Sequence, residues 1–488
     1  MAASQDRKWW ALALLSVVQF MVVLDIAIVN VALPSIQVDL GFSQENLQWV
    51  ISAYALVFGG FLLLGGRASD LLGRRRMFVA GLLAFGAGSL LAGLAWSEAS
   101  LIAARATQGL GAAIISPAAL SILMTTFREG RERNIALGVW GAVGGFGAAA
   151  GVLLGGVFTD LLSWEWIFFI NIPVALAAIA ATPFLLGESR DANAKSFDVL
   201  GAVLVTSGLS TSVFAITKAN DYGWTSARTI GLFSAAAALL LGFVAQELRA
   251  KDPLMSFSIF RIKTVTGANV AGFILGTALF SMFLMLTLYM QQVLGYSAMK
   301  TGVAYLAVAG TSIIWATVAS QLVTRIGVKP VLVTGMSLLT IGLFYFTQVS
   351  VDGSYVQDLL PGFLIVAMGM AFSFVSISIA ALAGIEAKEA GLASGLINTS
   401  QQIGGALGIA ILSSVAIAKT NNAAGSGEAM PEALTAGFHA AFWVGAVVAA
   451  LGVVASLVLI RQEELSAAPA ESADVAAIPE TEALPIAA

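Results

Sequence analysis

The stretch WALALLSVVQFMVVLDIAIVNVALP, residues 10–34, contains one charged side chain, Asp25. An apolar run of about 20 residues is long enough to cross the ~30 Å hydrocarbon core of a bilayer as an α-helix. Because the bilayer offers no water to the backbone, only helices and closed barrels span it, and a continuous run indicates a helix. We therefore expect residues 10–34 to form a membrane-spanning helix with Asp25 inside it.

Comparable runs recur along the chain, and 58% of the residues are hydrophobic while 11% are charged. A soluble domain has about 25% charged residues. The sequence thus predicts an all-α polytopic membrane protein with 14 transmembrane helices. The runs are 10–34, 46–65, 77–96, 100–123, 134–158, 166–187, 198–217, 227–247, 265–290, 301–322, 330–349, 358–383, 392–417 and 437–460.

Positive charges gather on one side of this predicted bundle. The chain has 24 Lys and Arg residues, and only Arg105 among them lies deep within a run. The loops opposite the termini hold four of the others, and the remaining 19 flank the side with both termini. Cytoplasmic loops carry an excess of Lys and Arg. We expect a multi-pass protein of the cell (inner) membrane with both termini cytoplasmic.

Several classes of function are disfavoured by composition. The chain has no cysteine and one histidine, His439. This excludes thiolate metal sites, His-rich metal sites and His-based catalytic triads. No loop is long enough for the soluble output domain of a sensor. We expect no enzymatic activity, no metal site and no nucleic-acid partner.

The loop GGRASDLLGRRR, residues 65–76, contains residue types that suit a tight, charged connection. Glycine permits a tight turn, and an acid can cap the next helix and accept hydrogen bonds from arginine. The loop is either a basic segment that sets topology or a conformational latch whose ion pairs form in one state. Its candidate residues are Gly66, Asp70, Gly73, Arg74, Arg75 and Arg76.

The fifth run is rich in glycine, and small residues let membrane helices approach closely. Gly138, Gly147 and Gly151 recur 257 residues later as glycines in the thirteenth run, which hints at an internal duplication. In a chain with 50 glycines, chance is the alternative explanation of this match, and ordinary tight packing is the alternative explanation of the glycine spacing. The set of interest is Gly138, Gly147, Gly151, Gly155 and Gly156.

These segments resemble motifs of the major facilitator superfamily. The loop is similar to its signature loop, with Ala68 and Leu71 as departures, and LIAARATQGLGAA (101–113) is similar to its fourth-helix motif at Arg105, Gln108 and Gly109. The glycines match its antiporter motif in spacing, with Val152 in place of the usual proline.

Three further segments resemble the fourteen-helix drug–proton antiporters of that superfamily. They are LDIAIVNVALP (24–34), WEWIFFINIP (164–173), in which Glu165 replaces an arginine, and GLASGLINTSQQIGGALG (391–408). The resemblance implies a major facilitator fold arranged as 6+2+6 helices. We expect an N-terminal bundle (1–190), two inserted helices (191–259), a C-terminal bundle (260–460) and a disordered acidic cytoplasmic tail (461–488), in a monomer.

Asp25 and Arg105 are ionisable residues within membrane runs, which are costly and usually functional. At 1.5 Å per residue, Asp25 lies about 13 Å from Pro34 and Arg105 about 7–8 Å from Ser100, so their depths are compatible. Asp25 is a structural partner of Arg105, a binder of a cationic substrate, or the proton carrier. Arg105 tunes Asp25 or is a packing residue. The second half has no deep acid, which favours a low proton count and disfavours dicationic substrates.

The resemblance implies a proton-coupled antiporter that exports lipophilic cationic or neutral drugs by alternating access, driven by the proton gradient without a cofactor. The alternative is a dedicated exporter of one self-made metabolite, such as an antibiotic. Polar and aromatic residues in or next to the runs are candidates for the substrate cavity, although packing or helix–helix contact also explains them. They are Asn30, Tyr54, Asn269, Tyr289, Gln291 and Gln401.

Overall fold

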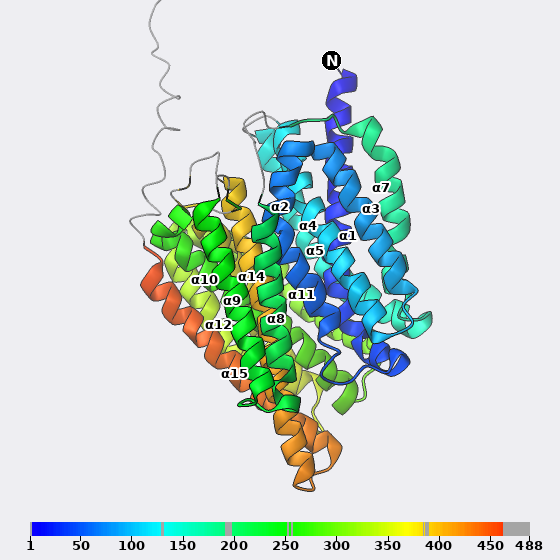
Figure 1. Ribbon diagram of the computed structural model, residues 1–488, viewed down its shortest axis with the longest axis vertical. Coiled ribbons are helices and arrows are strands. Elements are labelled where there is room, and N and C mark those ends of the chain that lie inside the picture. Colours follow the sequence, from blue (N-terminus) through cyan, green and yellow to red (C-terminus); the bar gives the residue numbers. More distant parts are fainter. Residues whose placement is uncertain are drawn as a thin grey trace, which may run out of the picture.

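The computed structural model describes residues 2–127, 131–190, 198–250, 253–254, 257–383, 385 and 390–461, which form helices and turns without a strand among them (Figure 1). The predicted tail lies outside the described residues, apart from Arg461. The elements are α1 (Ala2–Leu40), α2 (Trp49–Leu72), α3 (Arg74–Gly93), α4 (Glu98–Thr126), α5 (Arg131–Leu161), α6 (Trp166–Phe169), α7 (Asn171–Leu185), α8 (Val199–Tyr222), α9 (Ala227–Arg249), η1 (Phe257–Arg261), α10 (Lys263–Leu288), η2 (Tyr289–Val293), α11 (Ala298–Ile326), α12 (Val328–Phe346), η3 (Tyr355–Leu359), α13 (Leu360–Ala380), α14 (Ala390–Gly425) and α15 (Met430–Leu459).

The helices correspond to the predicted runs. Within the described part of the chain, thirteen helical segments are long and apolar enough to cross a membrane, with α6 and α7 counted as one segment. The remaining run corresponds to α5, a helix of 31 residues. The protein is therefore an all-helical, multi-pass membrane protein.

Helix ends differ from the predicted runs where polar residues extend a helix beyond its apolar part. The first helix was predicted to end at Pro34, whereas α1 continues to Leu40 with the proline inside it. A proline in a membrane helix is tolerated when neighbours satisfy the freed backbone groups. Here Gln291 of η2 donates to the carbonyl of Val31, next to the Asn30 carbonyl that Pro34 cannot bond. In Figure 1 the end of α14 and the start of α15 project beyond the other helices.

The helices pack as two groups and a pair. In the first group α1 packs against α5 and α7, while α4 packs against α2 and α3. In the second group α10 packs against α14 and α15, and α13 against α11 and α12. The pair α8–α9 contacts both groups through α8, which packs against α2 and α14. The groups themselves meet where α5 contacts α11 and α2 contacts α14.

The two groups are joined at one end of the bundle. We call the end with residue 2 and Gly73 the amino-terminal side, and the end with Ser43 and Lys218 the opposite side. On the opposite side, Asp160 of α5 accepts hydrogen bonds from the first two amides of α11 at 3.2 and 2.9 Å. Gln292 donates there to Gln37 of α1.

The charged contacts around the connection between α2 and α3, on the amino-terminal side, lie within the first group. Asp70 binds Arg74, and Glu188 lies beside Arg75 and Arg76. Near the middle of the bundle, Thr399 donates to the carbonyl of Gly59. The hydrogen bonds between the two groups thus lie on the opposite side and near the middle of the bundle.

Candidate functional site

Asp25 of α1 and Arg105 of α4 meet inside the first helix group. Nη1 of Arg105 lies 2.6 Å from Oδ2 of Asp25, and the side chains are 1% and 0% exposed. The sequence alone indicated only compatible depths. In the structure the two residues are directly paired and shielded from the surface.

The second carboxylate oxygen of Asp25 is also occupied. Oδ1 accepts a hydrogen bond from Nε2 of Gln108 at 2.9 Å and from Nδ2 of Asn171 at 2.8 Å. Gln108 in turn donates to Ser89 and accepts from Arg105. An ionised carboxylate only accepts hydrogen bonds, so three donors around Asp25 match its charged form. Buried charges persist when they are paired and hydrogen-bonded in this way.

Arg105 is fixed by further contacts of its guanidinium. Nε donates to the carbonyl of Val50 at 2.9 Å, and the guanidinium carbon lies 4.5 Å from the centre of the Tyr54 ring. It lies 5.7 Å from the ring of Phe168. A planar guanidinium uses several directional donors and aromatic faces at once, which an ammonium does not. Arg105 thus links α1, α2 and α4 in one network.

Glycines let the helices of the network approach each other. A Cβ on Gly109 would lie 2.5 Å from the carbonyl oxygen of Tyr54, and one on Gly88 would lie 2.8 Å from Cγ of Gln108. Since real Cβ atoms do not approach backbone atoms this closely, these positions require glycine. Gly109 and Gln108 of the predicted fourth-helix motif therefore serve the same network as Arg105.

The signature loop forms its charged contacts locally. Gly73 has a φ of 110°, in the left-handed region that favours glycine, and ends α2. Arg74 donates to Asp70 through Nε and Nη2, and Glu188 accepts from the backbone amide of Arg75. A Cβ on Gly66 would make only ordinary contact, 3.5 Å from Pro117. Glu188, a partner that sequence reasoning missed, lies 113 residues further along the chain.

The glycines of the fifth run divide into three kinds. Added Cβ atoms on Gly147, Gly151 and Gly155 would crowd α1, the last two within 3 Å of it. Gly156 approaches the backbone of Ala298 in α11 instead. Gly138 has no atom within 4 Å of an added Cβ, so it does not share the close packing.

The six candidate cavity residues are not brought together. Tyr54 lies against Arg105. Asn30 and Asn269 bond carbonyls of their own helices, and Gln291 bonds α1. Tyr289 donates to the carbonyl of Ser350. In α14, the backbone of Gln401 packs against Gly276. These contacts join neighbouring helices or turns of one helix, and the assignment of the six residues to a substrate cavity stays a prediction.

Asn171 and Ser89 belong to the network but were not predicted. Asn171 stands in the segment WEWIFFINIP, so the resemblance of this segment to the antiporters is the signal that could have marked it. Ser89 is one of many small polar residues in apolar runs and carries no signal of its own. Both are almost fully buried, at 1% and 0% exposure.

The chain is similar to known transport and resistance proteins along most of its length. It is 39% identical to a puromycin resistance protein of Streptomyces alboniger over 85% of this chain and 83% of that protein. It is 37% identical to a cephamycin export protein of Amycolatopsis lactamdurans over 83% and 84%, respectively. A tetracenomycin C resistance and export protein of Streptomyces glaucescens is 35% identical over 84% and 76%.

Solved structures agree on the fold. A bacterial homologue of the human lysosomal transporter Spinster superposes with a TM-score of 0.65 at 14% identity, over 93% of this chain and 98% of that one. A peptide transporter crystallised with sulfate gives 0.65 at 15% identity, over 92% and 93%. A family model matches residues 15–409, and the chain belongs to the Major Facilitator Superfamily.

Proposed function

We propose that this protein exports lipophilic, cationic or neutral small molecules from the cell in exchange for protons. The observation that carries the coupling is the buried pair of Asp25 and Arg105, which holds α1 against α4. The similarity to proteins named for puromycin resistance and cephamycin export supports small-molecule export.

The pair supports a specific form of coupling. A proton on Asp25 would cancel its charge and place an O–H group where three donors already point. Arg105 would then be a buried charge without a counter-ion, which is strongly unfavourable. Protonation therefore favours a rearrangement in which α1 and α4 separate at this point. In this proposal Asp25 is both the partner of Arg105 in one state and the proton carrier between states.

The proposed orientation places both termini in the cytoplasm, because most Lys and Arg residues lie on that side. The opposite side, sealed by Asp160 and η2, then faces out of the cell, and the conformation seen here is closed to the outside. We further propose that the working unit is a monomer in the inner membrane and that the proton gradient drives it without a cofactor.

A second candidate is a dedicated exporter of one metabolite made by the cell itself. The names of two relatives favour it, since each refers to a single antibiotic, puromycin or cephamycin. A monocationic substrate suits either candidate better than a dication, because Asp25 is a single carboxylate.

The test is transport by purified protein in liposomes with an imposed pH gradient, measured on a panel of lipophilic dyes, biocides and antibiotics. We expect gradient-driven transport by the wild type and none by Asp25→Asn that remains folded and inserted. Wild-type transport by Asp25→Asn would refute the coupling proposal. Transport of many unrelated compounds would favour the multidrug exporter over the dedicated one.

A further inference from the structure

A second polar region, outside the hydrogen bonds of the Asp25 network, lies at the seam between the helix groups on the opposite side. A partly open cavity of about 140 Å³ is lined there by the loop between α1 and α2 and by α10, α14 and α15. One wall is apolar and includes Leu284, Met285 and Phe438. The other wall is polar and includes Glu45, Gln48 and Ser413.

Two buried polar atoms of the cavity wall have no partner. Oε1 of Gln48 and Oγ of Ser413 make no hydrogen bond, although these residues are only 1% and 5% exposed. A buried polar group left unsatisfied costs about 1–3 kcal/mol. Because both groups line the same cavity, a single occupant with hydrogen-bond donors can satisfy both.

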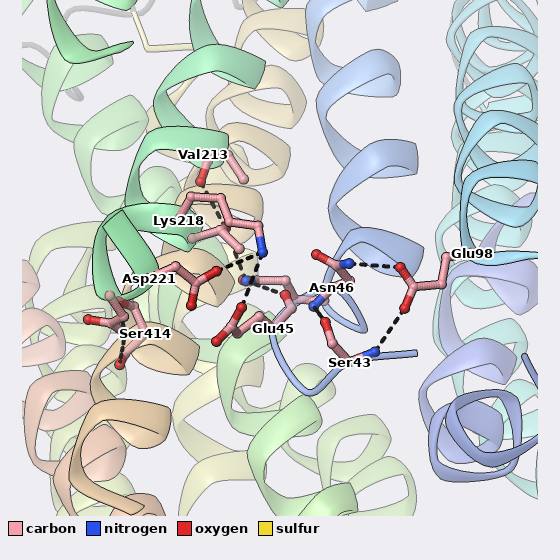
Figure 2. A network of polar contacts seen from close by, with 11 residues as sticks. Ser43, Glu45, Asn46, Glu98, Val213, Lys218, Asp221 and Ser414 are labelled. Atoms are coloured by element: carbon pink, nitrogen blue, oxygen red, sulfur yellow. Dashed lines mark hydrogen bonds and ion pairs between the residues drawn. The ribbon is translucent and has the colours of Figure 1, made fainter. Parts of the chain in front are cut away.

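A carboxylate adds charge to the same wall. Burial is the main cause that raises the pKa of Glu45 above its ordinary value of 4.5. Figure 2 shows Glu45 with Lys218 of α8, 3.2 Å away, and Lys218 also reaches Asp221 at 2.9 Å. Lys218 is thus shared between two carboxylates, and Glu45 keeps acceptor capacity for a further donor.

The inserted helix α8 holds two parts of the polar wall in place. Thr217 accepts a hydrogen bond from Gln48 at 3.0 Å, and this fixes the orientation of the Gln48 amide. Three residues further on, Asn220 donates to the carbonyl and the hydroxyl of Ser414, next to Ser413 in α14. The polar wall is therefore built before any ligand arrives, which lowers the entropy cost of binding.

We propose that this cavity is a binding site for a small amphiphilic amine with one ring, at the seam of the two helix groups. The amine would donate to Ser413, Gln48 and Glu45, and the ring would pack on Leu284, Met285 and Phe438. The volume of the cavity agrees with a ligand of one ring, because an engineered cavity of about 150 Å³ binds benzene. This site is distinct from the Asp25 network and does not depend on proton coupling.

The test compares benzylamine with benzyl alcohol and toluene, which keep the ring and change the donors. Binding to the full chain in lipid nanodiscs is measured by ligand-observed NMR titration at pH 7. We expect benzylamine to bind at least tenfold more tightly than toluene, with benzyl alcohol between them. Equal affinities for the three compounds, or no saturable binding because only water fills the cavity, would overturn the proposal.

Variants locate the site. Ser413→Ala and Glu45→Gln should each weaken benzylamine about tenfold and leave toluene nearly unchanged. Ser426→Ala is the control, because Ser426 is exposed, its hydroxyl donates to the carbonyl of Asn422 and it does not line the cavity, so this variant should keep wild-type affinity. Unchanged benzylamine binding in Ser413→Ala would refute this site.

Asp25→Asn separates the two proposals. We expect it to bind benzylamine as the wild type does while losing gradient-driven transport. Loss of benzylamine binding in Asp25→Asn would show that the ligand occupies the Asp25 region and would refute a separate site. Intact transport in Asp25→Asn with normal benzylamine binding would refute only the coupling.

Discussion

Arg105 binds Asp25 at 2.6 Å while its Nε donates to the carbonyl of Val50, so one guanidinium joins α4 to α1 and to α2. Lys has three donors on one atom and lacks the fork that reaches two directions at once. A positive charge alone is therefore not sufficient to make both contacts, and the geometry of the guanidinium is needed as well.

We predict that Arg105→Leu destabilises the protein by about 3–5 kcal/mol, because it leaves Asp25 buried without its counter-ion. The double variant Asp25→Asn/Arg105→Leu should recover part of this loss, since it contains no buried unpaired charge. Thermal unfolding in detergent measures both. A double variant less stable than Arg105→Leu would contradict the pairing, and neither variant should transport against a gradient.

Asn171 gives a second prediction, because it supplies one of the three donors to Asp25. Asn171→Leu keeps the size of the side chain and removes the donor, and it should cost about 1–3 kcal/mol of stability and lower transport. Asn398→Leu is the control, since Asn398 is exposed and bonds only its own helix at Ser394. Equal melting temperatures for the two variants would argue against a role of Asn171 in the network.

Hydropathy was sufficient to predict the helices, because a span must be apolar over a fixed length. It also marked Asp25 and Arg105, because charges within a span are rare. It did not mark Asn171 or Ser89, since these side chains carry no charge and helix packing also explains a neutral polar residue in a span. Asn171 and Asp25 are 146 residues apart, and a contact over that separation is decided by packing rather than by local pattern.

Helix ends were harder to predict for a related reason. Pro34 was interpreted as a terminator, yet α1 continues to Leu40, and Gln291 of the other helix group donates to the carbonyl of Val31 in this stretch. The antiporter-type glycines were correctly spaced, but only the structure distinguishes Gly138, which is free of close contacts, from Gly151, which lies against α1.

Two glycines provide a packing prediction. A Cβ on Gly109 would lie 2.5 Å from the Tyr54 carbonyl, whereas one on Gly66 would lie 3.5 Å from its nearest neighbour. Both residues are within helices, where alanine is favoured over glycine by about 1 kcal/mol. Gly109→Ala should therefore lower the melting temperature and transport, and Gly66→Ala should preserve or raise the melting temperature. A higher melting temperature for Gly109→Ala than for Gly66→Ala would show that the close approach of α2 to α4 does not limit stability.

The contact between Asp160 and α11 allows the conformational equilibrium to be tested. The carboxylate accepts from the amides of Ala298 and Met299 at a helix N-terminus, where a capping side chain contributes about 0.5–2 kcal/mol. Asp160→Asn weakens this contact and should raise the population of conformations open on the opposite side by several-fold.

The chain has no cysteine, so spin labels at Val38→Cys and Lys300→Cys report the distance between the groups without background. We expect a longer distance component in Asp160→Asn but not in Asp352→Asn, an exposed control on the same side. If the Asp160→Asn distribution matched that of the parent, the cap would not contribute to the seal.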